Sequence, residues 1–135
     1  MPRKARISDA LVGLMKGGER HAWTLDELYA ELVRRGPAGD FSSVFRAAEK
    51  LTGDGTSRKI LLEDGRARFE LVGAHHDHLH CLRCARVVPV PCVIGQRDIL
   101  ALERKTGVAI TEHHLVLNGL CRECRVLGAA AEALR

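Results

Sequence analysis

The strongest constraint on this chain is a repeated Cys-x-x-Cys motif, which pairs Cys81 with Cys84 and Cys121 with Cys124. Each motif can present two thiolates on one side of a tight turn, and four thiolates form a closed tetrahedral site suited to Zn²⁺. Because no coordination position stays open for a substrate, the predicted role of this zinc is structural. The alternative is two unrelated pairs, one of them redox-active. We expect the fifth cysteine, Cys92 in VPVPCVIG, to be a small buried hydrophobic residue rather than a ligand.

The composition is that of a folded protein without a membrane span. The chain has 135 residues, of which 46% are hydrophobic and 28% charged, enough for one domain or two small ones. No segment approaches the roughly 20 apolar residues that cross a bilayer, and MPRKAR is not followed by an apolar signal region. We therefore expect a cytoplasmic protein, whose reduced cysteines favour metal binding over disulfides. The net charge of +4 is compatible with a nucleic-acid partner but does not require one.

Two helices are expected near the start of the chain. Apolar residues recur with helical spacing in ISDALVGLMKG, residues 7–17, where Ser8 is a candidate cap. The segment TLDELYAELVRRG, residues 24–36, begins with the capping-box pair Thr24 and Glu27.

A third helix and a hairpin follow. DFSSVFRAAEKLTGDG predicts a helix that begins at Asp40 or Ser42. Its expected inward-facing residues are Val44, Phe45, Ala48 and Leu51. In RKILLEDGRARFEL, two β-prone runs flank an Asp64-Gly65 turn, which is typical of a hairpin. Three helices and a hairpin predict a winged helix-turn-helix DNA-binding domain over residues 1–73.

This arrangement places one polar face of the third helix and the basic hairpin toward DNA. The expected base- and backbone-facing residues of the helix are Ser42, Ser43, Arg46, Lys50 and Ala47. The expected phosphate contacts of the hairpin are Arg58, Lys59, Arg66 and Arg68. The alternative is a solvated charged face on a helical domain.

Residues 74–135 are predicted to form a small α/β domain, which makes the whole chain α+β. ARVVPVPC predicts an edge strand, VIGQRDILALERKTG a helix, VAITEHHLVLNGL a strand and RECRVLGAAAEALR a helix. Because a sheet of two or three strands is marginal alone, we expect it to be completed across a homodimer interface.

The segment HHDHLHCLRC, residues 75–84, concentrates metal-binding side chains. In an extended strand, alternation places His76, His78 and His80 on one face, and His75 with Asp77 on the other. Each face alone has too few ligands to hold a metal ion. The candidate partners are Glu70, His21 and either His113 or His114. We expect His80 and His114 themselves to be exposed.

Two metal sites are consistent with these faces. Glu70 and His21 from the DNA-binding side, with His76 and His78, would fix the angle between the two halves of the chain. A second site would use Asp77 and His113. The alternative is a polar surface or support for the cysteines. A metalloenzyme is not expected, because neither an H-E-x-x-H motif nor an H-x-E with P-C-x-x-C motif occurs.

The order of these motifs resembles the ferric uptake regulator family of bacterial metal-dependent repressors. The most specific parts are RFEL before HHDHLHCLRC, and TGVAITEHHLVLNGLCREC. The family's DNA-reading Thr-Val-Tyr-Arg resembles Ser43-Val44-Phe45-Arg46 here, which adds Phe45 to the expected DNA contacts.

The resemblance implies a homodimer that binds a palindromic AT-rich operator when a divalent ion is bound. It implies structural zinc on the four cysteines of the repeated motif, and regulatory ligands at Glu70, His76 and His78. The family's histidine before the second helix aligns with Ala22, one position after His21. A third site would use His75 or Asp77 with His113, and its glutamate aligns with Gln96. Without a thiolate, the regulatory ligands favour Fe²⁺ or Mn²⁺, whereas Zn²⁺ or peroxide sensing are family alternatives. A more distant alternative is a zinc-stabilised nucleic-acid-binding adaptor without metal sensing.

Overall fold

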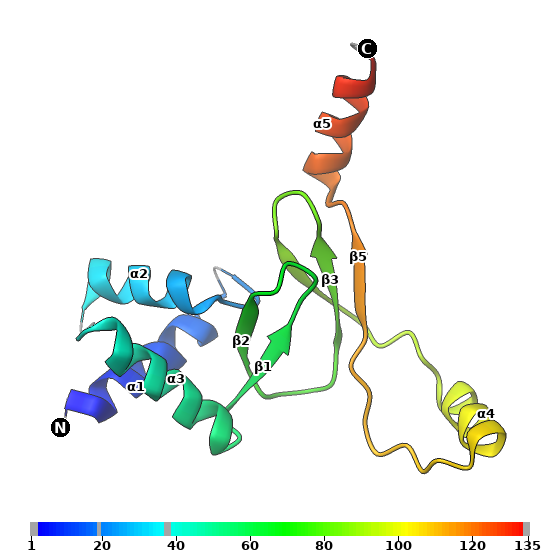
Figure 1. Ribbon diagram of the computed structural model, residues 1–135, viewed down its shortest axis with the longest axis horizontal. Coiled ribbons are helices and arrows are strands. Elements are labelled where there is room, and N and C mark those ends of the chain that lie inside the picture. The colour runs from blue at the N-terminus through cyan, green and yellow to red at the C-terminus, as the bar shows by residue number, and fades with distance from the viewer. Residues whose placement is uncertain (1–2, 19, 37–38, 134–135) are drawn as a thin grey trace. The chain divides into compact units, whose positions relative to one another are not determined.

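The computed structural model describes residues 3–18, 20–36 and 39–133. The chain divides into two compact units, Met1–Gly73 and Ala74–Arg135 (Figure 1). The first unit contains α1 (Arg3–Lys16), α2 (Leu25–Arg35), α3 (Phe41–Gly53), β1 (Ser57–Leu61) and β2 (Ala67–Leu71). The second contains β3 (Asp77–Cys81), β4 (Val87–Val90), α4 (Gln96–Thr106), β5 (Val116–Gly119) and α5 (Arg122–Ala133). Among the described residues, no helix is both long and apolar enough to cross a membrane.

Local capping explains where the helices of the first unit begin. Thr24 and Glu27 form the predicted capping box at the start of α2. The Asp40 carboxylate accepts the Ser43 N–H at 2.7 Å, so Asp40 rather than Ser42 caps α3. Ser8 is not a cap, because it lies well inside α1.

The first unit is built around one apolar core. Its buried members come from all three helices, the segment before α2 and the hairpin: Ile7, Leu11, Leu14, Met15, Trp23, Leu28, Leu32, Val44, Ala47, Ala48, Leu51 and Phe69. Trp23 and Phe69 exchange two backbone hydrogen bonds of 3.0 and 2.7 Å, which attach the segment before α2 to β2. The hairpin pairs β1 with β2 antiparallel, as predicted. Together these elements form the predicted winged helix-turn-helix.

Two expectations for α3 are wrong. Phe45, expected inside, has 46% of its surface exposed, whereas Ala47, expected to face DNA, is only 8% exposed. The core stripe of α3 therefore runs through Val44, Ala47, Ala48 and Leu51. Phe45 is left on the outer face beside Phe41.

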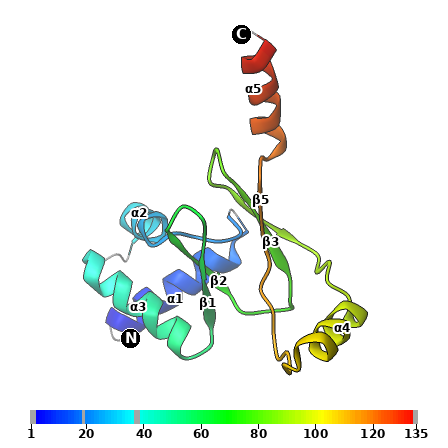
Figure 2. The ribbon, with the colours of Figure 1, turned by 45° about the vertical axis from the view of Figure 1, so that its right-hand side comes forward.

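The second unit contains a small sheet in which β3 is the central strand. The strand order is β4-β3-β5, with β4 antiparallel and β5 parallel to β3. β4 returns the chain to the end of the sheet where β3 begins, and the segment that contains α4 then leads to the other edge of β3, so β5 can run parallel to it (Figure 2). β4 is an edge strand, and edge strands tolerate a proline such as Pro89, which has no N–H to donate.

Two expectations for this unit are also wrong. The predicted strand in VAITEHHLVLNGL is limited to Val116–Gly119, so that residues 108–115 form no regular strand. His80, expected to be exposed, is only 1% exposed on the central strand β3. By contrast, α4 has no buried residue and stands apart from the strands in Figures 1 and 2.

Candidate metal centres and nucleic-acid surface

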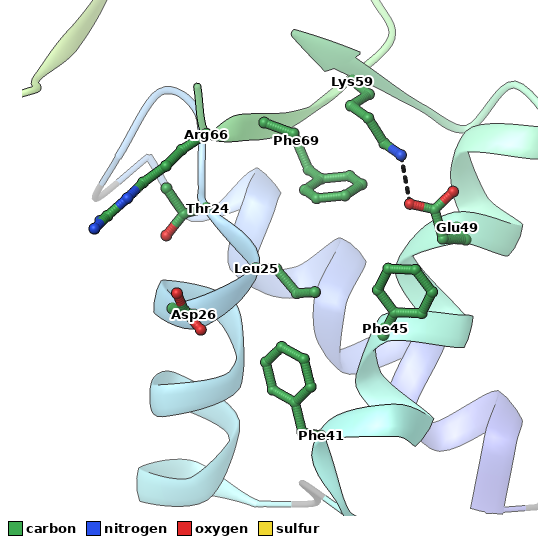
Figure 3. Close-up of a pocket in the computed structure, with 10 residues that line it drawn as sticks. Thr24, Leu25, Asp26, Phe41, Phe45, Glu49, Lys59, Arg66 and Phe69 are labelled. Carbon is green, nitrogen blue, oxygen red and sulfur yellow. Dashed lines mark hydrogen bonds and ion pairs between the residues drawn. The ribbon is translucent and has the colours of Figure 1, made fainter. Parts of the chain in front are cut away.

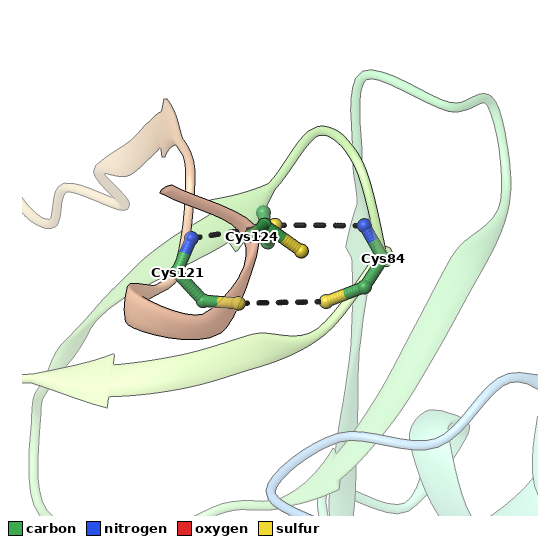
Figure 4. A group of neighbouring side chains, drawn as sticks. Cys84, Cys121 and Cys124 are labelled. Carbon is green, nitrogen blue, oxygen red and sulfur yellow. Dashed lines mark hydrogen bonds between the residues drawn. The ribbon is translucent and has the colours of Figure 1, made fainter. Parts of the chain in front are cut away.

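The four cysteines of the repeated motif come together in the second unit. Their sulfur atoms lie within 4.8 Å of one another. Zn–S bonds of about 2.3 Å in a tetrahedron separate the sulfur atoms by roughly 3.8 Å. The Cys84 and Cys121 sulfurs are 3.8 Å apart (Figure 4), so this donor set fits zinc.

Backbone geometry prepares one of these sulfur atoms to be a thiolate. Burial acts to raise the pKa of the Cys81 thiol, but the N–H groups of Cys84 and Cys121 donate to its sulfur and lower the pKa to about 6. The Cys124 thiol interacts with Cys121 and is desolvated, which raises its pKa to about 12. The Cys81 thiolate therefore forms readily, whereas a bound cation would be needed to stabilise a thiolate at Cys124.

The turn from Cys81 to Arg86 contains an unusual backbone conformation just after Cys84. The Ala85 N–H donates to the Cys81 carbonyl at 2.9 Å, and the Cys81 N–H donates to the Arg86 carbonyl at 2.9 Å. Ala85 has a φ of 67°, in the left-handed region that glycine adopts more easily. This tight turn places Cys84 opposite Cys121.

In the first unit, the structure brings His21 and Glu70 together. The His21 Nε2 lies 2.7 Å from Oε2 of Glu70, and the Arg58 Nε lies 3.5 Å from Oε1. Glu70 is on β2 and is only 1% exposed. His21 reaches it because the Trp23–Phe69 bridge holds the preceding segment beside β2. The position occupied by Ala22 is buried.

In the second unit, His76 and His78 are neighbours. Their ring centroids are 4.6 Å apart, and the His76 Nδ1 lies 3.0 Å from the Ala74 carbonyl. The buried His78 also lies against His114, with 2.9 Å between Nδ1 and Nε2. His114 is exposed, as expected, but sequence reasoning did not predict its contact with His78.

A third cluster lies entirely within the second unit. The ligand atoms of His75, Asp77, Cys92 and His113 are all within 4.8 Å of one another. Cys92 is exposed, so its expected role as a buried hydrophobic residue is wrong. Sequence reasoning missed its place here, because no local motif connects VPVPC with His113. Gln96, which the resemblance suggested, is exposed at the start of α4.

Asp77 is the anchor of this cluster. Its Oδ1 accepts the Leu115 N–H at 3.2 Å and lies 3.6 and 3.7 Å from Nε2 of His75 and His113. Burial acts to raise the pKa of Asp77, but the Leu115 N–H and the two imidazoles outweigh it and hold the pKa below its ordinary value. The carboxylate is therefore ionised and able to coordinate a cation.

The outer face of α3 carries most of the expected DNA-binding residues. Ser42, Phe45, Arg46 and Lys50 are exposed, and Ser43 is partly exposed. A pocket of about 270 Å³ lies beside this face, between α2, α3 and the hairpin (Figure 3). Its lining residues are Thr24, Leu25, Asp26, Phe41, Phe45, Glu49, Lys59, Arg66, Ala67 and Phe69.

The basic residues of the hairpin differ in their surroundings. Lys59 makes a 2.5 Å ion pair with Glu49 of α3 and lies over the Phe69 ring. Arg66 is exposed, and Arg58 is half-buried against Glu70. The expectation for Arg68 is wrong.

Arg68 is 3% exposed because it is held within the hairpin. It donates two hydrogen bonds of 3.0 and 2.7 Å to the Asp64 carboxylate. It also donates one of 2.9 Å to the Arg66 carbonyl. The side chain thus stabilises the turn instead of facing phosphate.

Comparison with known proteins places this architecture in a family. The family model described as the ferric uptake regulator family matches residues 4–118. The ferric uptake regulation protein of Escherichia coli K12 is 31% identical over 121 residues, which cover 85% of this chain and 80% of that protein. Its counterpart in Legionella pneumophila is 29% identical over 83% of each chain.

A solved structure agrees with these matches. The crystal structure of the Vibrio cholerae ferric uptake regulator superposes with a TM-score of 0.74 at 27% identity, covering 90% of each chain. The chain belongs to the ferric uptake regulator family, whose members are metal-responsive transcription regulators and not enzymes.

Proposed function

We propose that the protein is a repressor that binds double-stranded operator DNA as a homodimer when Fe²⁺ or Mn²⁺ occupies a regulatory site. The ligands of this site are Glu70 and His21 from the first unit and His76 and His78 from the second. Because the ligands belong to both units, ion occupancy selects one relative orientation of the units, and that orientation fits DNA. The protein acts in the cytoplasm, where the operator lies.

The buried carboxylate of Glu70 is the observation that carries this proposal. A carboxylate is costly to bury unless it is paired or coordinates a metal. Glu70 faces the His21 ring nitrogen at 2.7 Å, although the family resemblance aligned the usual histidine with Ala22. His21 is therefore the fourth regulatory ligand in this proposal. Within the second unit, the adjacent rings of His76 and His78 supply the other two donors.

The chemistry of these ligands favours Fe²⁺ or Mn²⁺. Imidazole and carboxylate donors suit both ions and also Zn²⁺, whereas a thiolate would select for zinc. The regulatory set contains three histidines, one glutamate and no cysteine. A zinc-sensing or peroxide-sensing regulator of the same family is the alternative.

The four clustered cysteines have a separate role in this proposal. They hold a structural Zn²⁺ that stays bound while the regulatory ion exchanges. The 3.8 Å separation of the Cys84 and Cys121 sulfurs supports this assignment.

The DNA-binding surface consists of the outer face of α3 and the hairpin. Its residues are Ser42, Ser43, Phe45, Arg46, Lys50, Arg58, Lys59 and Arg66. The half-exposed Phe45 ring suits contact with a thymine methyl group in the major groove. The exposed Arg46 and Lys50 can neutralise phosphates, which makes the affinity dependent on salt.

Uncovered apolar side chains in the second unit support a homodimer. Leu100 and Leu102 on α4 are 41% and 48% exposed, and Leu117 on the edge strand β5 is 41% exposed. A second copy of the chain would cover these side chains and extend the short sheet.

Operator binding titrated separately with Fe²⁺, Mn²⁺, Zn²⁺ and Ni²⁺ tests the function and identifies the ion. Only the exchangeable metal is removed beforehand. We expect Glu70→Gln and His76→Ala to abolish metal-dependent binding while the dimer persists. The control is Glu63→Gln, which changes an exposed glutamate in the same unit. Equal operator affinity with and without added ion would instead indicate the zinc-stabilised adaptor.

A further inference from the structure

The cluster of His75, Asp77, Cys92 and His113 has the spacing of an ion site. The Nε2 atoms of His75 and His113 are 2.9 Å apart, and the Cys92 sulfur is 3.3 Å from Nε2 of His113. Zn–N bonds of about 2.0 Å and Zn–S bonds of about 2.3 Å separate tetrahedral ligand atoms by roughly 3.3–3.6 Å. The observed separations come within about 0.5 Å of this range, so a small adjustment of the side chains would seat an ion.

Asp77 supplies independent evidence that the cluster is a binding site. The side chain is fully buried, with 0% of its surface exposed. Although Oδ1 accepts the Leu115 N–H, the buried Oδ2 has no hydrogen-bond partner among the described residues. An unsatisfied buried carboxylate oxygen is costly, and a cation bound by the neighbouring histidines would remove this cost.

We propose that Cys92 completes a third site, in which a thiolate, two imidazoles and the Asp77 carboxylate hold a Zn²⁺-class ion. The site lies wholly in the second unit, so it forms independently of the orientation of the DNA-binding unit. Unlike the regulatory site proposed above, it contains a sulfur ligand, the Cys92 thiolate.

The thiolate determines which ions the third site accepts. Soft sulfur donors favour Zn²⁺ and Co²⁺ over Mn²⁺, whereas the regulatory set of imidazoles and a carboxylate offers no sulfur. The same chain would thus contain two exchangeable sites with different metal preferences. A supply of Zn²⁺ would fill the third site even when Mn²⁺ fills the regulatory one.

The position of Cys92 explains how the site can lack a glutamate on α4. Gln96 begins that helix and is a neutral, weaker donor. Cys92 lies before the helix and also contacts the Ile94 carbonyl at 3.5 Å, which holds its sulfur near His113. The charge that Gln96 cannot supply comes from the thiolate.

Co²⁺ titration of the full chain, with its cysteine-bound zinc retained, tests the proposal without DNA. A sulfur-to-cobalt charge-transfer band should appear as the third site fills, because the regulatory ligands contain no sulfur. We expect Cys92→Ser to remove this band and to weaken Zn²⁺ binding at the site at least about tenfold. The matched control Gln96→Ala should keep both. In each variant, the content of cysteine-bound zinc and the circular dichroism spectrum report whether the fold is intact.

Thiol alkylation provides a second measurement that does not depend on spectra. Zn²⁺, but not Mn²⁺, should protect Cys92 from iodoacetamide in the wild-type protein, and His113→Ala should abolish that protection. An unchanged band in Cys92→Ser, or equal alkylation of Cys92 with and without Zn²⁺, would overturn the proposal. So would loss of the band in Gln96→Ala alone. Failure of metal-dependent operator binding would count only against the regulatory site.

Discussion

The two units of the chain bury different chemistry. The first unit encloses apolar side chains from three helices and a hairpin. The second buries Asp77, His78, His80 and Cys81 along its central strand, and α4 contributes no buried residue. A core of the first kind is stabilised by removing apolar surface from water, at about 25 cal/mol per Å². A core of the second kind is stable only when its polar groups are hydrogen-bonded, paired or bound to a cation. We therefore expect the first unit to fold on its own and the second to depend on bound metal.

The largest expected effect is that of removing the structural ion, which should affect the second unit and not the first. We expect Cys84→Ser to unfold the second unit, because binding of structural zinc contributes on the order of 10 kcal/mol to such domains. The first unit should keep its helices. Hydrogen exchange resolved by residue measures both units in one sample. Cys92→Ser is the control, since it leaves the cluster of four sulfurs intact. Simultaneous loss of protection in both units would contradict the contrast.

Truncation of an apolar core side chain should destabilise the first unit and leave the second unchanged. Leu28 is 0% exposed in the apolar cluster, so Leu28→Ala should lower the free energy of unfolding of the first unit by about 2–5 kcal/mol. Bound zinc should remain unchanged. Chemical denaturation followed by Trp23 fluorescence measures the loss, and zinc content is measured by a colorimetric chelator. On the same helix, Val33→Ala changes a residue that is 59% exposed and should have little effect.

Loss of a helix cap should give a smaller change in the same unit. Thr24→Ala removes the hydrogen bond from the Glu27 N–H to the Thr24 hydroxyl, and should cost about 1 kcal/mol. Thermal unfolding detects this change. Thr24→Ser should restore most of the stability because it retains the hydroxyl. If alanine and serine behave alike, the capping box contributes little.

The smallest predicted effect is at the cysteine turn. Ala85 has a φ of 67°, so Ala85→Gly relieves an unfavourable conformation. Glycine also loses more backbone entropy on folding, which leaves a net stabilisation of the second unit of at most about 1 kcal/mol. The rate of zinc release to a chelator should fall slightly. Faster release in Ala85→Gly would show that the turn is not strained.

The elements of the first unit were predictable because their signals are local. The capping box at Thr24 and the Asp64-Gly65 turn each lie within a few residues and determine a helix start and a hairpin. The burial of Arg68 was missed, although its partner Asp64 is only four residues away. A charged side chain is buried here because the Asp64 carboxylate pairs with it inside the hairpin.

The errors in the second unit arise from long-range pairing. The central position of β3, which carries the buried His80, depends on pairing with β5, a parallel strand that follows α4 in the chain. The approach of Cys92 to His113 likewise joins two segments that no motif connects. Such contacts are set by tertiary packing. The cluster of four cysteines, by contrast, could be predicted because two short Cys-x-x-Cys motifs supply its residues.

Strand β3 is only five residues long, yet it carries one ligand of each of the three ion sites that we propose. In the proposals above, Asp77 is a ligand of the third site, His78 of the regulatory site and Cys81 of the structural site. Since the strand is hydrogen-bonded along both edges, these side chains share one backbone that cannot adjust separately for each ion. We therefore expect an ion bound at one site to order the strand for the other sites, and linkage makes such an effect mutual. Binding of one ion should therefore raise the affinity of the chain for the others.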